Sequence, residues 1–150
     1  MHSLKNFAVC SLFVTTGLAA TLPIARAETP QKFADLEVKI TDPALIKKDL
    51  NIRTMFITLY DSESQRPMPY GAMKVDLDKD AKGSFYKGSL TTENVMVMGG
   101  GGGELPKSLR IKARLDKDGS AGPDAAGDLV GTADHVKVGS KVVITIDKAI

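Results

Sequence analysis

Apolar and polar residues alternate in short runs through most of the chain after residue 28. Alternation with a period of two predicts β-strands, because successive side chains of a strand point to opposite faces of a sheet. The runs with this pattern cover residues 36–40, 55–59, 73–77, 84–91, 95–98, 109–115, 129–138 and 142–146. We therefore expect about eight strands, separated by segments rich in glycine, proline, aspartate and asparagine.

The clearest of these runs is Leu109 to Leu115, in which odd-numbered positions are apolar and even-numbered positions are Arg110, Lys112 and Arg114. A strand with one buried and one solvated face gives this pattern. The three cations would form a positive row along the strand. Such a row could attract an acidic or extended partner, and its plainer interpretation is an ordinary solvated face. Because no aromatic residues are interleaved with the cations, the pattern argues against binding of single-stranded nucleic acid.

Short strands at intervals of roughly 8–12 residues, without a long helical period, favour an antiparallel β-sandwich or barrel. Of the two we expect the sandwich. The segment from Asp42 to Asn51 has an aspartate as a possible cap and a proline in its first turn, so it could form one short helical turn. That turn is too short to change the fold class, and we expect residues 28–150 to form a single β-sandwich domain.

The N-terminal 27 residues differ in composition from the rest of the chain. They contain no acidic residue, carry Lys5 before an apolar stretch, and end in Ala25-Arg26-Ala27. This arrangement is typical of a cleavable secretory signal peptide, which predicts an exported protein. Gly17 and Pro23 interrupt the apolar stretch, which disfavours a retained membrane anchor. No later segment is long and apolar enough to predict a transmembrane span.

Removal of this segment would change both the charge and the cysteine content. Of the 20 basic residues, Lys5 and Arg26 lie within it, which leaves 18 basic residues against 18 acidic ones. The apparent basicity then disappears, and with it the main support for binding to a polyanion. Cys10 is the only cysteine. The exported chain would therefore have no disulfide and no cysteine nucleophile or metal ligand.

Residues that could carry catalysis are few after the predicted cleavage site. His135 is the one remaining histidine, and we interpret it as a surface or edge residue. The glycine run Gly99–Gly103 is followed by Glu104, without the Lys-Ser/Thr of a phosphate loop. The spacings Asp76-x-Asp78-x-Asp80 and Asp116-x-Asp118 lack the later ligands of a calcium loop, so we interpret them as solvated strand ends and turns. We expect no enzyme activity, cofactor or metal.

Met96 and Met98 are two residues apart, so both thioethers would lie on one face of a strand. Thioethers are soft ligands that suit cuprous copper. The alternative, which we favour, is that Val95 to Met98 form a strand packed on both sides, with methionine as an adaptable core residue.

Several segments, in order, resemble the C-terminal periplasmic domain of the CcmI/CycH proteins of cytochrome c maturation. The family has a Pro-Pro-Met-Pro turn after its second strand, a Met-rich segment, a recognisable strand and turn, and a closing Gly-Asp-Leu-x-Gly with a final strand. The matching segments here are Arg66-Pro67-Met68-Pro69, Met96–Met98, Leu109–Ala121, Gly127–Gly131, Val138-Gly139 and Ile144–Asp147.

The resemblance implies an immunoglobulin-like β-sandwich that acts in the periplasm without catalysis. Such a domain would hold haem-free apocytochrome c, or a component of the haem ligation machinery, through its pockets and sheet edges. The candidate partner-binding residues are Arg66, Pro67, Met68, Pro69, Met96, Met98, Arg110, Lys112 and Arg114. Two other functions stay open: a periplasmic copper-handling protein with methionine ligands, and a structural accessory subunit of a larger complex.

Overall fold

The computed structural model describes residues 29–45, 52–64, 68–77, 83–98 and 104–150. Within these residues the regular structure consists of nine strands and one short 3₁₀ turn, Pro43–Leu45. The strands are β1 (Lys32–Ile40), β2 (Thr54–Asp61), β3 (Gly71–Asp76), β4 (Ser84–Thr91), β5 (Met96–Val97), β6 (Ser108–Asp116), β7 (Leu129–Lys137), β8 (Lys141–Ile146) and β9 (Lys148–Ala149). No helix in the described part of the chain is long and apolar enough to cross a membrane.

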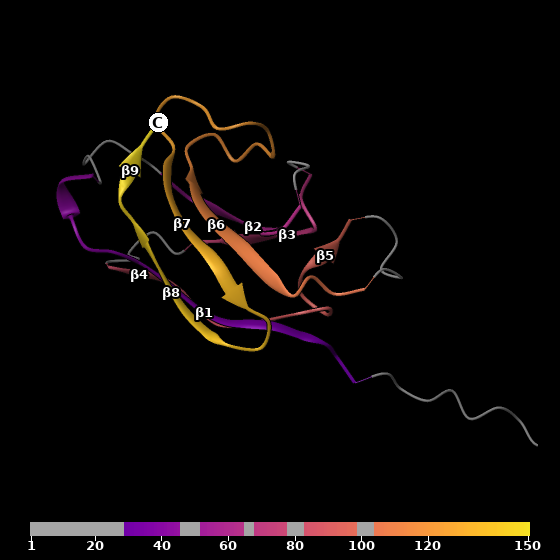
Figure 1. Cartoon of the computed structure of the whole chain (residues 1–150). Coiled ribbons are helices and arrows are strands. Elements are labelled where there is room, and N and C mark those ends of the chain that lie inside the picture. Colours follow the sequence, from indigo (N-terminus) through magenta and orange to yellow (C-terminus); the bar gives the residue numbers. More distant parts are fainter. Residues whose placement is uncertain (1–28, 46–51, 65–67, 78–82, 99–103) are drawn as a thin grey trace, which may run out of the picture.

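The strands form two sheets that pack face to face (Figure 1). One sheet has the order β4-β1-β8, and the other has the order β5-β3-β2-β6-β7-β9. All neighbouring strands are antiparallel except β1 and β8, which run parallel. The predicted β-sandwich is confirmed.

The core lies between the two sheets and is built from the apolar half of each alternating run. The apolar odd-numbered residues of β2 and β6 face apolar even-numbered residues of β1 and β8 across the interior. The buried residues of these four strands are Met55, Ile57, Leu59, Leu109, Ile111, Ala113, Leu115, Ala34, Leu36, Val38, Ile40, Ile144 and Ile146. Full burial of one such aliphatic side chain stabilises the fold by about 1.5–3 kcal/mol relative to exposure. Phe33 adds an edge-to-face contact with Tyr70, with ring centroids 5.9 Å apart.

Some predicted element boundaries differ from the structure. The run predicted at 95–98 contains a strand of two residues, and the run predicted at 73–77 begins earlier, at Gly71. The short strand β9 has no alternating pattern that could have predicted it. The predicted signal peptide with Cys10, the segment 46–51, Arg66, Pro67 and the glycine run Gly99–Gly103 lie outside the described residues.

A bulge interrupts the pairing of β6 with β7. Leu109 pairs with Val136 and Ile111 pairs with Ala133, so Asp134 and His135 together oppose one residue of β6. His135 has φ 54° and is exposed. The interpretation of this histidine as a surface residue is confirmed, and the bulge turns the neighbouring Asp134 toward the basic side of β6.

Candidate functional site

A groove with a volume of about 420 Å³ lies on the outer face of the six-stranded sheet. Its floor is formed by Phe56, Thr58 and Tyr60 of β2, by Lys112 and Arg114 of β6 and by Ala72 of β3. Pro69 and Met98 line it on one side, and the segment from Ala121 to Asp124 lines it on the other. Aromatic, proline and methionine side chains therefore share this groove with two cations.

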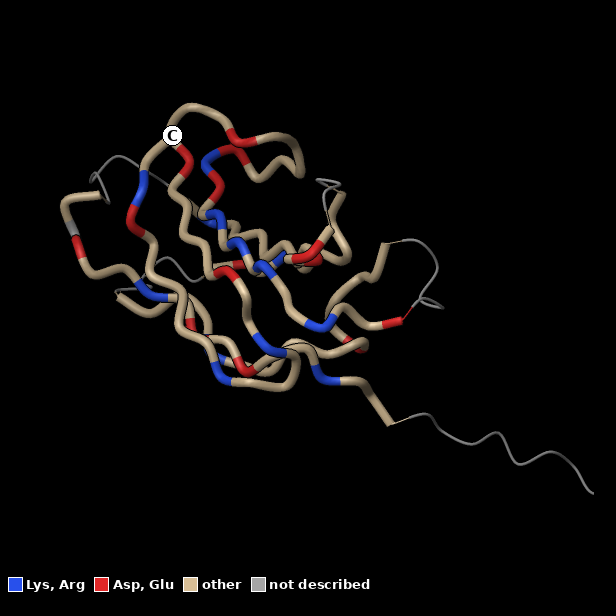
Figure 2. The backbone as a smooth tube through the Cα atoms, viewed as in Figure 1, with Lys and Arg blue, Asp and Glu red and all other residues tan. Residues whose placement is uncertain are grey.

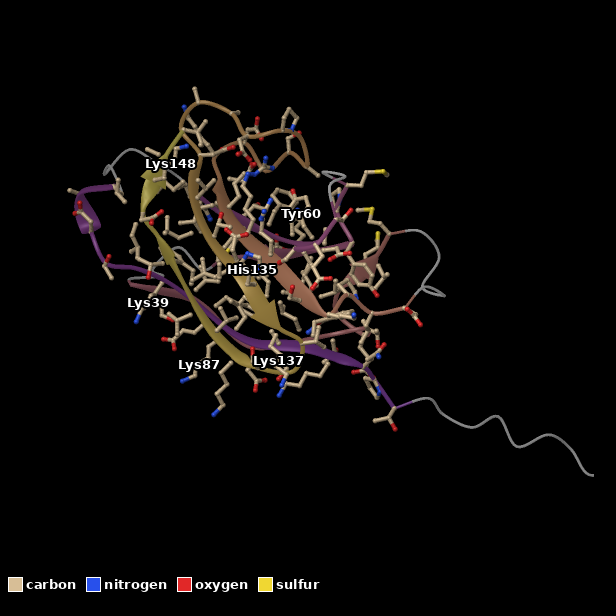
Figure 3. The ribbon with its side chains drawn as sticks, in the orientation of Figure 1. Lys39, Tyr60, Lys87, His135, Lys137 and Lys148 are labelled. Atoms are coloured by element: carbon tan, nitrogen blue, oxygen red, sulfur yellow. The ribbon has the colours of Figure 1, made fainter. Side chains whose placement is uncertain are left out.

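The register of β2 and β6 explains why these residues meet. Phe56 is paired with Arg114, Thr58 with Lys112, and Tyr60 with Arg110. Directly paired residues of an antiparallel sheet point to the same face. The basic row predicted on β6 therefore lies beside a row that contains two aromatic side chains. Figure 3 labels Tyr60.

Arg114 is buried, with 6% of its surface exposed. Its Nη2 lies 2.8 Å from Asp116 Oδ2 and also donates a hydrogen bond to the carbonyl oxygen of Ser120, and Nη1 donates to that of Gly122 at 2.6 Å. The guanidinium carbon lies 5.2 Å from the centre of the Phe56 ring, within cation–π range. Arg114 thus joins the floor of the groove to the loop beside it.

Two buried carboxylates hold this loop, which runs from residue 117 to 128. Asp116 Oδ1 accepts hydrogen bonds from the backbone N–H groups of Asp118, Gly119 and Ser120. Asp128 accepts from the N–H of Lys117 with one oxygen and from the N–H of Ala125 with the other. Because Asp116 is 2% exposed, its interpretation as a solvated strand end is wrong.

The other two cations of the row are also paired. Lys112 donates to Asp124, which holds the pKa of the Asp124 carboxyl below its ordinary value. Arg110 forms an ion pair with Asp134 from the bulge of β7. Figure 2 shows basic and acidic positions interleaved on this side of the molecule.

The interpretation of the row as an ordinary solvated face is wrong at Arg114, which is buried, while Arg110 is half-exposed and Lys112 partly exposed. Asp116, which pairs with Arg114, is the last residue of β6, whereas Asp124 comes from the loop and Asp134 from the bulge of β7. Nothing in the sequence of β6 places Asp124 or Asp134 beside it. Attraction of an acidic partner loses its basis, because the charge of each cation is already compensated within the chain.

The exposure of Met96 and Met98 differs from the interpretation that we favoured from the sequence. Met96 is 74% exposed and Met98 is 49% exposed, whereas Val95 is buried. The expectation of a strand packed on both sides is wrong, because β5 is a short edge strand beside β3. Met96 lies opposite Ala72 of β3. The Met98 N–H donates to the Tyr70 carbonyl, and Met98 lines the groove.

The structure brings part of the predicted residue set together. Pro69, Met98, Lys112 and Arg114 line the groove. Met68, which is 72% exposed, directly precedes Pro69 in the chain. Arg66 and Pro67 lie outside the described residues. Sequence reasoning missed the groove residues Phe56, Tyr60, Pro123 and Asp124.

A signal for two of these missed residues was present in the sequence. Phe56 and Tyr60 occupy the polar face of an alternating strand, where large aromatic side chains are unusual unless something covers them or they bind a partner. The positions of Pro123 and Asp124 depend on how the loop folds back, which alternation does not encode.

The three-stranded sheet has a depression of its own on its outer face, of about 400 Å³. Its lining includes Asp35, Glu37, Lys87, Lys141 and Val143. Among the described residues, no three His, Cys, Asp or Glu side chains are placed to hold a metal ion.

No family model, curated protein or solved structure matches the chain. The functional hypothesis therefore depends on the residues of the groove and on the resemblance noted from the sequence.

Proposed function

We propose that the protein is a non-enzymatic binding domain that holds an extended segment of another polypeptide in the groove of the six-stranded sheet. The observation that carries this proposal is the combination of Phe56, Tyr60, Pro69 and Met98 in one groove. Aromatic and proline side chains offer flat apolar contact area, and methionine adapts to different partners. Grooves of this kind recognise extended, proline-containing or apolar segments.

The charges of the groove support the same kind of ligand. Lys112 and Arg114 are compensated by Asp124, Asp116 and Asp128, so the cations shape the groove without demanding an anionic ligand. The loop held by Arg114 gives the groove a preformed wall, and preorganisation lowers the entropic cost of binding.

The client that we propose is haem-free c-type cytochrome, held in the periplasm before haem attachment. This choice follows from the resemblance to the C-terminal domain of the CcmI/CycH proteins, because the segments that match its Pro-Pro-Met-Pro turn and its Met-rich segment contribute Pro69 and Met98 to the groove. The N-terminal segment with signal-peptide character supports a periplasmic location.

Calorimetric titration with haem-free and haem-attached forms of one c-type cytochrome tests this proposal. We expect the haem-free form to bind and the haem-attached form to bind far more weakly. The affinity should change little between low and high salt, because the cations of the groove are paired internally. Absence of binding to the haem-free form contradicts the proposed client.

Two matched variants locate the binding surface. Tyr60→Ala removes an aromatic contact from the groove and should weaken binding about tenfold or more, as truncation of an aromatic contact at the centre of an interface does. Val143→Ala, on the outer face of the other sheet, removes a side chain that is 50% exposed and should leave the affinity unchanged. Equal affinities of the two variants contradict the assignment of the groove.

The exposure of Met68, Met96 and Met98 favours a second candidate function, the handling of cuprous copper. Competition titration of Cu(I) against a chelator tests it with a Met96→Leu/Met98→Leu double variant, which keeps apolar volume and removes both thioethers. Met55→Leu, which removes a fully buried thioether, is the control. If copper binds, the double variant should lose it and the control should keep it; unchanged copper affinity in the double variant contradicts this function.

A further inference from the structure

The edge of β3 is open along most of its length. β5 pairs with Gly71 and Ala72, while β2 pairs with the whole strand from its other side. Among the described residues, no strand pairs with the outer edge of Met73–Asp76. An edge of this kind presents unpaired backbone groups to another chain.

The pairing with β2 determines which backbone groups point outward. The Leu77 N–H donates to the Arg53 carbonyl at 2.8 Å, and the pairing of β2 with β3 continues in the same register. Hydrogen-bonded and non-hydrogen-bonded pairs alternate along an antiparallel ladder. The odd-numbered residues of β3 therefore bond to β2, and the N–H and C=O groups of Lys74 and Asp76 point toward the open edge.

The side chains along this edge are divided between the two faces. Lys74 and Asp76 lie on the outer face, with side chains 54% and 87% exposed and a distance of 3.7 Å between Lys74 Nζ and Asp76 Oδ1. Met73, Val75 and Leu77 are partly buried against the margin of the core. An added strand would cover these apolar side chains and would meet one cation and one anion on the outer face.

We propose that β3 is a dimerisation strand and that its partner is β3 of a second copy of the same chain. The two strands run antiparallel, with Val75 of each copy at the two-fold axis. Lys74 of one copy then lies opposite Asp76 of the other, and symmetry repeats this pair. Met73 lies opposite Leu77 of the second copy, so opposite charges and apolar residues both match.

Charge selects this register among the alternatives. Opposing residues of an antiparallel pair point to the same face of the sheet. Each alternative symmetric register of β3 with β3 therefore places a different residue of the strand on the two-fold axis. Centring it on Lys74 places two lysines opposite each other, and centring it on Asp76 places two aspartates opposite each other. The register centred on Val75 avoids both and makes Lys74 and Asp76 the hydrogen-bonded pairs, as their outward N–H and C=O groups require.

The pairing joins the two six-stranded sheets edge to edge. Both grooves then open on the same face of one continuous sheet, because paired strands share their outer face. The dimer does not depend on the function proposed for the groove, since β3 contributes Ala72 to the groove and the interface lies beyond it.

Sedimentation equilibrium of the full chain over a concentration series tests this proposal through complementary charge changes. Lys74→Asp places like charges opposite each other at two symmetry-related positions, and so does Asp76→Lys. Each variant should raise the dimer dissociation constant about tenfold or more. A mixture of the two variants should form the mixed dimer at wild-type strength, because every pair across its interface has opposite charges. Lys87→Asp, on the exposed face of β4, is the control and should leave dimerisation unchanged.

Hydrogen exchange provides an independent measurement of the same contact. The amide protons of Lys74 and Asp76 should become protected as the concentration rises, while protection of the Val75 amide, bonded to β2, should not change. A chain that stays monomeric at millimolar concentration overturns the proposal. So does a dimer that is insensitive to both charge changes, or a mixture that dimerises no better than the variants alone.

Discussion

The outer faces of the two sheets have the same alternation of polar and apolar residues but different environments. On the three-stranded sheet, the outward charges of β1, β4 and β8 surround an open depression, and Figure 3 shows Lys39 and Lys87 extending away from the sheet. On the six-stranded sheet, the loop 117–128 folds back over β6 and buries Arg114 with Asp116 and Asp128. The contrast shows that an outward row of polar side chains forms a groove where a loop packs over part of the row and shields it from water.

The largest expected difference between the two faces concerns Arg114. Arg114→Met removes the cation and leaves the buried carboxylates of Asp116 and Asp128 without their partner, which should lower the free energy of unfolding by about 3 kcal/mol. Arg110→Met removes a half-exposed partner of Asp134 and should cost about 1 kcal/mol or less. Urea denaturation of both variants measures the difference. Equal losses of unfolding free energy in the two variants would mean that the burial of Arg114 contributes nothing to stability.

Asp128→Asn tests how far the loop depends on its carboxylate. Both oxygens of Asp128 accept backbone N–H bonds, and an amide can accept with one atom only. We expect a loss of about 1–3 kcal/mol in unfolding free energy, since one backbone N–H loses its hydrogen bond to this buried carboxylate. The exchange rate of the Lys117 or Ala125 amide should rise, as seen by NMR. Unchanged exchange rates at both amides would show that the conformation of the loop does not depend on this carboxylate.

A smaller effect is expected from the pH dependence of Asp124. The hydrogen bond and charge of Lys112 lower the pKa of Asp124 below the ordinary 3.8, so the unfolded chain binds the proton more readily than the folded one. The resulting stabilisation is present above pH 3.8 and is lost as the pH falls through the folded pKa. The stability difference between wild type and Asp124→Asn should therefore shrink on acidification below about pH 4. A difference that stays constant under these conditions would contradict this contribution.

The smallest effect is expected on the three-stranded sheet. Hydrogen bonds from Lys32 and Ser89 lower the pKa of Asp35, but the pair is open to solvent. Lys32→Ala should raise the pKa of Asp35 toward its ordinary 3.8, measured by NMR titration, without a detectable change in unfolding free energy. A clear loss of stability would show that the two outer faces are less different than their burial indicates.

The sequence predicts the fold better than it predicts the site. Strand positions and the inward residues follow from alternation, because each run has one apolar face and the two sheets bury these faces against each other. The groove depends on contacts between segments far apart in the chain. The position of Asp124 beside Lys112 and the bulge that turns Asp134 toward Arg110 arise from loop closure and register, which no local pattern specifies.

Met96 and Met98 also show that local sequence does not determine which side chains are exposed. The sequence Val95–Met98 is apolar throughout, so it is consistent with either a buried or an exposed strand. The outcome was decided by sheet order, which places β5 at an edge and leaves Met96 exposed. Sheet order is a property of the whole fold and cannot be deduced from one run.

The parallel pairing of β1 with β8 has a consequence for the order of folding. Asp35 pairs with Lys141 and Ile40 with Ile146, so an early segment of the chain requires a partner more than 100 residues later. Gly131 allows the final strands to close over the core, because a Cβ there would lie 2.2 Å from the Thr145 carbonyl oxygen. Contacts this distant make folding slow. Until β8 is available, a growing chain exposes one edge of β1 and is vulnerable to aggregation.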